Sequence, residues 1–438
     1  MPDANHNTPP DSACDPAPSA PLSAPSAKKL SAAGLPLQNR WLSIIAVIWA
    51  GQAVSMITSY AAGYAVVWYV TETTESALML SIMTACVMLP IGLISPFGGL
   101  VADKHNRKLI MIAADGAVGL VSLAAALFIM AGEASLPLLL AICLARAVGQ
   151  AFHSPAMMAT MPMLVPNEHL LRINTLDQLL NSVASIGAPA FGIFLYTTLG
   201  FPSVMLLDFA GACAAILGLA LAKVPTVVDP AAEQQHALTN LLDGWREIAK
   251  TRGLALLMAV VTLAMMIFGP LSAVFPLITY SHFGGDGYMA SIAEAAFGIG
   301  MVVGSAALMA WGGGKRLAAL IAVAAVITGA MTAIIGLLPP DGFPVFVGLV
   351  ALMAVACAWY NGPIMTLVQR HVPDEKMGRA MGLLTAMMGI ATPVGVMLGG
   401  ALAEAVGIAP FFVMDGLACL ALGLVAYLPP SIRELDHP

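Results

Sequence analysis

Twelve apolar runs, each about as long as a membrane-spanning helix, limit what this chain can fold into. A helix needs about 20 residues to cross a bilayer. These runs are too long for barrel strands and lack the alternation of apolar and polar residues that barrel strands show. Hydrophobic residues make up 59% of the chain, more than a soluble core requires. We therefore expect an all-α polytopic membrane protein with spans near residues 42–69, 77–98, 109–131, 136–158, 176–198, 202–223, 253–280, 288–311, 317–338, 343–367, 378–403 and 408–428.

The basic residues lie on one side of this arrangement. Of the 18 Lys and Arg residues, all except Arg146 fall in the termini or in alternate connections between spans. Basic residues that flank spans stay on the cytoplasmic side during insertion. This pattern predicts that both termini are cytoplasmic. The connections expected on the outer side contain no Lys or Arg, and they are residues 71–76, 132–135, 199–201, 281–287, 339–342 and 404–407.

The two sets of six spans resemble copies of one another. Several residues recur at a constant offset of 207, each at the equivalent point of a six-helix unit. Such matches indicate an internal duplication, and parallel repeats of six spans are a transporter architecture with a site between the repeats. We predict six-helix bundles at 39–223 and 253–430. The recurring pairs are Val165 and Val372, Pro166 and Pro373, Glu168 and Glu375, Arg172 and Arg379, Gly200 and Gly407, and Asp208 and Asp415.

Three further segments complete the expected organisation. Residues 1–38 are rich in Pro, Ala and Ser and are predicted to be a disordered cytoplasmic tail. The linker 224–252 contains an amphipathic pattern that predicts a short helix, lying either on the membrane surface or against the protein. Residues 431–438 form the expected cytoplasmic C-terminus.

The sequence argues against several functional classes. It has no P-loop of an ATP-driven pump and no HExxH or GxSxG motif of a membrane enzyme. A membrane sensor would usually carry a large soluble module, which the tail and the linker do not supply. The cysteines show no metal or disulfide spacing. We expect no enzyme activity, no cofactor, no metal and no nucleic-acid partner.

A cluster of charge interrupts the apolar pattern between the second and third runs. Within GGLVADKHNRK, Gly99, Asp103, Arg107 and Lys108 look like the signature loop of the major facilitator superfamily. The resemblance continues in RAVGQAFHSPA at 146–156 and in other segments between about residues 40 and 430. These are WAGQAVSMITSY near the first span, GAPAFG at 187–192 and QRHVPDEKMGR at 369–379.

Together these motifs resemble the macrolide-efflux-like branch, the third drug:proton antiporter group. The resemblance implies a monomeric carrier in the bacterial inner membrane that exports small, largely apolar compounds by proton antiport with alternating access. Its partners would be the substrate, protons and the lipid bilayer. Carriers of a siderophore, a lipid or another metabolite, and proton symporters, remain alternatives. The segment 187–192 departs from the longer antiporter motif by having Ala188 where Gly is usual.

The resemblance also assigns roles to residues of the charged loop and of the fifth span. In the family, the loop forms a conformational latch, which here would comprise Gly99, Asp103, Arg107 and Lys108, with Asp115 as one candidate partner of Arg107. The alternative is that the basic residues merely anchor the topology. In the fifth span, the shortened antiporter motif would place a helix bend at Gly187, Pro189 and Gly192.

Ionisable side chains inside spans are costly and normally face the interior of the bundle. The repeated acids Asp208 and Asp415 are expected to make structural hydrogen bonds. In the resembled fold, helices 4 and 8 line the cavity, and we assign Arg146, Gln150 and Glu294 to it. Glu294 is the predicted proton-coupling residue, because among these three only a carboxyl group exchanges a proton at physiological pH. A permanently neutral Glu294, hydrogen-bonded between helices, is the alternative.

Two smaller predictions concern residues near these spans. His153 is interpreted either as a hydrogen-bonded histidine or as a proton carrier, with the first favoured. Small residues spaced four apart allow helices to approach closely. This spacing is found in two pairs of glycines, Gly300 with Gly304 and Gly395 with Gly399.

Overall fold

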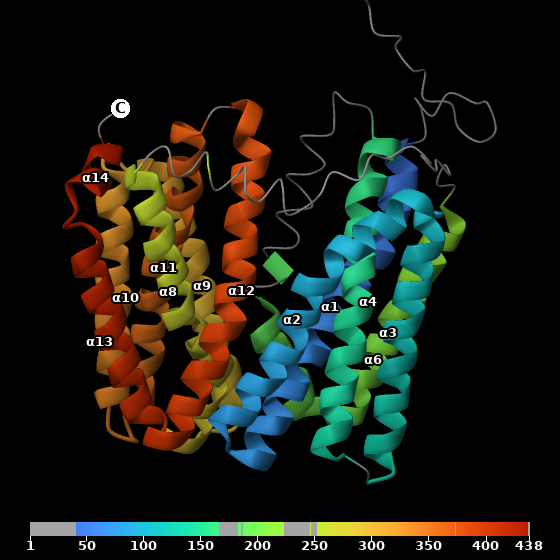
Figure 1. The fold of residues 1–438 in the computed structure, drawn as a ribbon. Coiled ribbons are helices and arrows are strands. Elements are labelled where there is room, and N and C mark those ends of the chain that lie inside the picture. Colours follow the sequence, from blue (N-terminus) through green and yellow to red (C-terminus); the bar gives the residue numbers. More distant parts are fainter. Residues whose placement is uncertain are drawn as a thin grey trace, which may run out of the picture.

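The computed structural model has the predicted all-helical fold (Figure 1). In the described part of the chain, 11 helices are long and apolar enough to cross a membrane, and the shorter apolar helix Gly187–Leu199 lies where the fifth span was predicted. Almost all of the tail and the 224–252 linker fall outside the described residues, as does the side chain of Asp103. The described residues are 41–132, 134–165, 183–184, 187–222, 246, 252–372 and 374–436.

The helices form two groups that follow the sequence (Figure 1). The first group contains α1 (Trp41–Thr74), α2 (Ala77–Lys104), α3 (Arg107–Met130), α4 (Leu136–Leu164), the helix Gly187–Leu199 and α6 (Phe201–Leu221). The second contains α8 (Arg252–Leu277), continued by a π-helical turn (Ile278–His282), α9 (Gly287–Trp311), α10 (Leu317–Leu337), α11 (Phe343–His371), α12 (Asp374–Val406), α13 (Ile408–Ala426) and α14 (Pro430–Arg433).

Polar side chains define where several of these helices begin. Ser76 accepts a hydrogen bond from the Met79 amide at the start of α2. Asn106 and Asp286 cap α3 and α9 in the same way. A cap of this kind satisfies one of the backbone donors that the first turn leaves free. The capping residues therefore determine where these helices begin, because their apolar sequences alone do not mark a first residue.

The predicted repeat is visible in the backbone. Gly200 and Gly407, which are 207 residues apart, precede α6 and α13 with φ angles of 78° and 89°, a region that favours glycine. Val165 and Val372 end α4 and α11 in extended conformations with ψ angles of 132° and 129°. Equivalent positions therefore make the same turns in both halves.

Among the described residues, the two halves contact each other mainly at one end of the molecule. There α2 crosses α12, at the bottom of Figure 1, and Gly400 lies directly against Ser81. We call this the closed end, defined by residues 71–80, 278–290 and 400–408. We call the opposite end, which carries Lys104, Lys108 and Arg370, the basic end.

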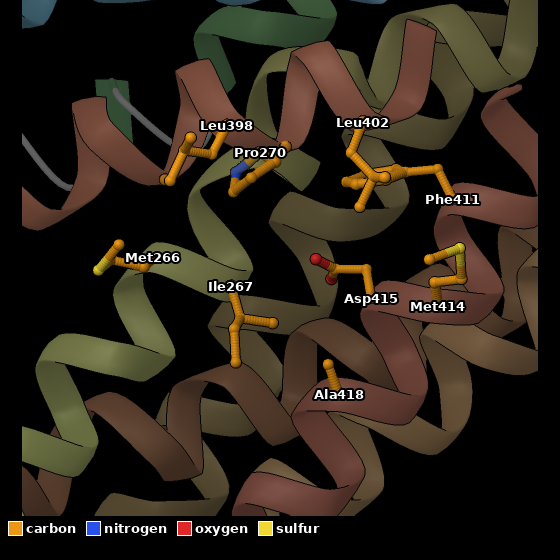
Figure 2. Close-up of a pocket in the computed structure, with 11 residues that line it drawn as sticks. Met266, Ile267, Pro270, Leu398, Leu402, Phe411, Met414, Asp415 and Ala418 are labelled. Atoms are coloured by element: carbon orange, nitrogen blue, oxygen red, sulfur yellow. The ribbon is translucent and has the colours of Figure 1, made fainter. Parts of the chain in front are cut away.

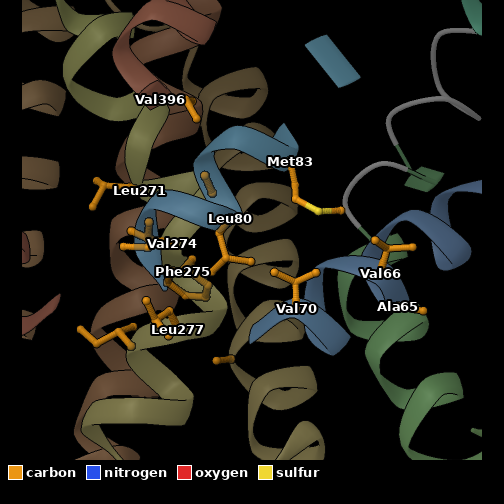
Figure 3. Packing of buried hydrophobic residues seen from close by; sticks show 14 of the residues in the cluster. Ala65, Val66, Val70, Leu80, Met83, Leu271, Val274, Phe275, Leu277 and Val396 are labelled. Atoms are coloured by element: carbon orange, nitrogen blue, oxygen red, sulfur yellow. The ribbon is translucent and has the colours of Figure 1, made fainter. Parts of the chain in front are cut away.

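A shared apolar cluster stabilises the closed end. Val70, Leu80 and Met83 of the first half pack in one cluster with Val274 and Phe275 of the second (Figure 3). Two other clusters, one within each half, lie toward the basic end. Among the described side chains, the apolar packing between the halves is therefore concentrated at the closed end.

Close helix packing within the second half agrees with the predicted glycine pairs. Gly300 and Gly304 of α9 lie against the backbone at Ala351 and Val355 of α11. Gly395 and Gly399 of α12 pack in the same manner against α8. Small residues at these positions allow the helices to approach more closely than larger side chains would permit.

Candidate functional site

Polar and aromatic contacts close the space between the halves at the closed end. The Oε2 atom of Glu404 on α12 accepts hydrogen bonds from the Ser76 hydroxyl at 2.9 Å and the Leu78 amide at 3.2 Å. An acid at a helix N-terminus also interacts favourably with the helix dipole. Trp68 of α1 meets the ring of Tyr280 edge to face, with centroids 6.0 Å apart. Both halves therefore contribute to the closure.

Glu294 lies close to the boundary between the halves. It belongs to α9 in the second half and is only 8% exposed. One turn earlier on the same helix, Ala290 packs in one buried cluster with Trp68 and Ile193 of the first half. In the described part of the chain its carboxyl group makes no hydrogen bond or ion pair. The alternative of a Glu294 hydrogen-bonded between helices is therefore not what this conformation contains.

Arg146 belongs to a network inside the first half. Its guanidinium group on α4 pairs with the carboxylate of Asp208 on α6, which is 0% exposed. Asp208 also accepts hydrogen bonds from Ser59 at 2.7 Å and from Ser122 at 2.6 Å, while Arg146 donates to the Ser59 carbonyl. The predicted structural role of Asp208 is confirmed. Arg146 is directed toward Asp208 in this conformation, whereas the sequence assigned it to the cavity.

A second polar cluster joins three helices of the first half. Gln52 of α1 donates a hydrogen bond to Asp115 of α3 at 2.9 Å, and Nε2 of His153 on α4 lies 3.4 Å from the other carboxylate oxygen. This Nε2 atom is within ion-pair distance but makes no hydrogen bond. Asp115 is therefore placed with Gln52 and His153. The predicted pairing of Asp115 with Arg107 is absent from the described contacts.

The charged loop connects helix ends at the basic end. Arg107 donates hydrogen bonds to the carbonyl oxygens of Ala102 at 3.1 Å and Ala159 at 2.7 Å. The ammonium group of Lys108 donates to the carbonyl of Ala222 at 2.8 Å, just after α6. These contacts attach α3 to the ends of α2, α4 and α6.

The remaining predicted site residues are placed as follows. Gln150 is exposed on α4 and donates a hydrogen bond to Ser154 at 2.9 Å. Gly99 lies beside Pro155, which brings α2 near α4. Gly192 packs against the backbone of Ala61 in α1. Gly187 begins the described part of its helix and Pro189 follows in the first turn, so the helix bend predicted there remains a prediction.

Asp415 does not make the predicted structural hydrogen bond. In the described part of the chain neither of its carboxylate oxygens has a hydrogen-bond partner, although the residue is only 7% exposed. At the offset of 207, the partners of Asp208 correspond to Met266, Gly329 and Met353 in the second half. The acid was retained in both halves, but the donor side chains were not.

Sequence reasoning missed the roles of Glu72 and Glu404. Glu72 accepts hydrogen bonds from Trp68 at 2.9 Å and from Tyr196 at 2.8 Å, and Glu404 joins the two halves. The first of these contacts spans four residues of one helix and was therefore detectable from spacing. The contact between Glu404 and Ser76 joins residues 328 positions apart, and no local pattern indicates it.

The described residues contain no group of three or more His, Cys, Asp or Glu side chains arranged to hold a metal ion. The side chains at these sites can exchange protons at carboxyl and imidazole groups, and they can form or break ion pairs when helices move.

Comparisons with known proteins agree with this architecture. Residues 34–437 match the transmembrane secretion effector family. Macrolide efflux protein A of Streptococcus pyogenes is 32% identical over 401 residues, which is 91% of this chain and 98% of that protein. The multidrug efflux pump Tap of Mycobacterium tuberculosis is 26% identical over 84% of this chain and 89% of its own length. An auto-inhibited peptide transporter of the POT family shares the fold, with a TM-score of 0.66 at 11% identity, over 88% of this chain and 96% of that one.

Proposed function

Because this chain belongs to the transmembrane secretion effector family of the major facilitator superfamily, we propose that it exports small, largely apolar compounds by proton antiport with alternating access. The names of its efflux relatives favour macrolides and chemically varied drugs as substrates. Export of a siderophore, a lipid or another metabolite uses the same architecture and is the alternative. Transport by a monomer is the simplest arrangement, because each chain contains both six-helix halves.

The placement of Glu294 is the observation that carries this proposal. It is a buried acid on α9, a helix that packs against the other half through Ala290, and it has no hydrogen-bond partner in the described part of the chain. A charged carboxylate in such surroundings is costly, whereas a neutral carboxyl group is tolerated. Movement of the halves changes those surroundings and therefore the group's affinity for a proton, which links proton exchange to the conformational cycle.

We place the basic end in the cytoplasm, following the positive-inside rule. The closed end then faces outward, and this conformation corresponds to the inward-facing state. In the outward-facing state the contacts of Glu404 with Ser76 and Leu78 would break. The loop of Gly99, Asp103, Arg107 and Lys108 would act as a latch at the basic end, where the halves must then meet.

The orientation is testable with single cysteines in a cysteine-free variant. Asp341→Cys is expected to react with a membrane-impermeant thiol reagent added to intact cells, because Asp341 is exposed on the outward side in this orientation. Lys104→Cys, which is exposed at the basic end, is expected to react only after the cells are opened. The reverse pattern would invert the orientation and contradict the assignment of the basic end to the cytoplasm.

The transport direction is tested with purified protein in liposomes. A radiolabelled macrolide and a pH-sensitive dye trapped inside report substrate and proton movement together. Antiport predicts that addition of the macrolide on one side moves protons toward that side. Movement of protons and macrolide in the same direction would establish symport and contradict the proposal. If the macrolide does not move, a panel of drugs compared in cells with and without the protein identifies the substrate for the same assay.

A further inference from the structure

A pocket lies beside Asp415 in the second half. It has a volume of about 280 Å³ and lies between α8, α12 and α13. Met266 and Pro270 line it from α8, Leu398 and Leu402 from α12, and Met414 from α13 (Figure 2). Asp415 is the polar side chain in this lining, and its carboxylate points into the space between these apolar groups.

The origin of the pocket can be followed in the repeat. In the first half, Gly51 and Gly218 bring the backbones of α1 and α6 into contact. The equivalent positions in the second half are Met258 and Val425, which are too large for such an approach. The glycines of α13 instead face α10, where Gly416 lies against Ala333. Because α13 packs tightly on α10, a space remains between α13 and α8.

The carboxylate in this space lacks a donor from the protein. Asp208 receives its hydrogen bonds from Ser59, Ser122 and Arg146, and Asp415 has no equivalent donors. A buried carboxylate with no partner is unfavourable, and native structures normally satisfy such groups. A ligand that brings a positively charged donor into the pocket would satisfy it.

The mouth of the pocket is apolar. Leu398 and Met414, which border it, are 62% and 46% exposed, as expected for side chains that face lipid. Asp415 is the eighth residue of α13, about 10 Å along the helix at about 1.5 Å per residue. A ligand that reaches this carboxylate from the bilayer must therefore combine an apolar body with a positive charge.

We propose that the Asp415 pocket binds lipophilic amines in their protonated form, with the ammonium N–H group donating to the carboxylate of Asp415 and the apolar body packed between α8, α12 and α13. The site lies within the second half, so it is separate from the boundary position of Glu294. Its volume is just below the usual range for drug-sized ligands, so it suits a small amine or the amine-bearing end of a larger compound.

The test uses purified full-length protein in lipid nanodiscs and a radiolabelled, photoreactive dialkylamine as the probe. Cross-linked peptides are expected to map to α12 and α13 around Leu398 and Met414. Asp415→Asn is expected to weaken binding about tenfold or more, because it removes a charge-assisted hydrogen bond. An uncharged analogue, with carbon in place of the amine nitrogen, is expected to label poorly.

Two controls keep the experiment decisive. Ala418→Leu fills the pocket without altering the carboxylate, and it is expected to block labelling even if Asp415→Asn folds poorly. Met309→Leu, an exposed position on α9 outside the pocket, is expected to leave labelling unchanged. Equal labelling by the uncharged analogue would overturn the proposal, as would labelling that survives both Asp415→Asn and Ala418→Leu.

Discussion

The two halves of this protein place an acid at the same point of the repeat and surround it differently. Asp208 is enclosed by Arg146, Ser59 and Ser122, whereas Asp415 faces an apolar pocket. The backbone turns that precede both residues are alike, with positive φ angles at Gly200 and Gly407. The difference shows that the neighbouring side chains, and not the position in the fold, determine whether a buried acid is held by hydrogen bonds.

The largest effect is expected when the first half is made to resemble the second. Arg146→Met, which copies Met353, leaves Asp208 buried without its countercharge. Removing one partner of a buried ion pair destabilises a protein by roughly 3–5 kcal/mol. We expect a marked loss of thermal stability, measured for the purified protein in detergent. The double variant with Asp208→Met is expected to recover much of this loss, because no charge is then left unpaired.

The matched change in the second half, Asp415→Asn, is expected to alter stability by less than about 1 kcal/mol, since it breaks no ion pair. Similar losses in Arg146→Met and Asp415→Asn would contradict the contrast drawn between the halves.

A smaller but still substantial effect is expected at the basic end. Arg107→Ala removes hydrogen bonds to the carbonyl oxygens of Ala102 and Ala159. A hydrogen bond that involves a charged group contributes at most about 3 kcal/mol to stability. If the loop acts as a latch, transport should fall severely while membrane insertion and substrate binding persist. Efflux by cells that contain equal amounts of protein measures this. Normal efflux by Arg107→Ala would reduce the loop to a topology anchor.

The smallest effect is expected at the closed end. Glu404→Gln weakens the acceptor for Ser76 and Leu78 in an exposed setting, where such interactions contribute about 1 kcal/mol or less. We expect the halves to separate more often at this end. Ser81→Cys, buried against Gly400, should then react with a thiol reagent several times faster. The control combines Ser81→Cys with Asp341→Asn. If the cysteine reacts faster by the same factor in this control, the contact of Glu404 is not responsible.

The sequence was sufficient to predict the architecture because the physical signals for it are long and repeated. Runs of about 20 apolar residues specify spans, and the offset of 207 linked Gly200 with Gly407 before their common backbone conformation was known. Buried charge in α3, α4, α6, α9 and α13 was likewise evident from composition. What remained undetermined was which of these charges meet.

Which charged side chains pair depends on how the helices are rotated and how they cross. No local sequence pattern specifies either. Arg146 was assigned to the cavity and is found paired with Asp208. Asp115 was a candidate partner of Arg107 and is found beside His153. The repeat suggested that Asp415 makes the same structural hydrogen bonds as Asp208. Sequence reasoning therefore missed that Asp415 has no donor among the described residues. The sequence did indicate this difference at the offset of 207. Ser59 and Arg146, which donate to Asp208, correspond to Met266 and Met353, whose side chains cannot donate hydrogen bonds.

The most direct test of the proposed mechanism is Glu294→Gln in liposomes, because Gln keeps the size of the side chain but cannot exchange a proton. We predict that this variant still exchanges a radiolabelled substrate down its gradient and no longer accumulates it when a proton gradient is imposed. Asp341→Asn should behave like the unmodified protein in both assays. Proton-dependent accumulation by Glu294→Gln at the level of the unmodified protein would show that Glu294 is not the coupling residue.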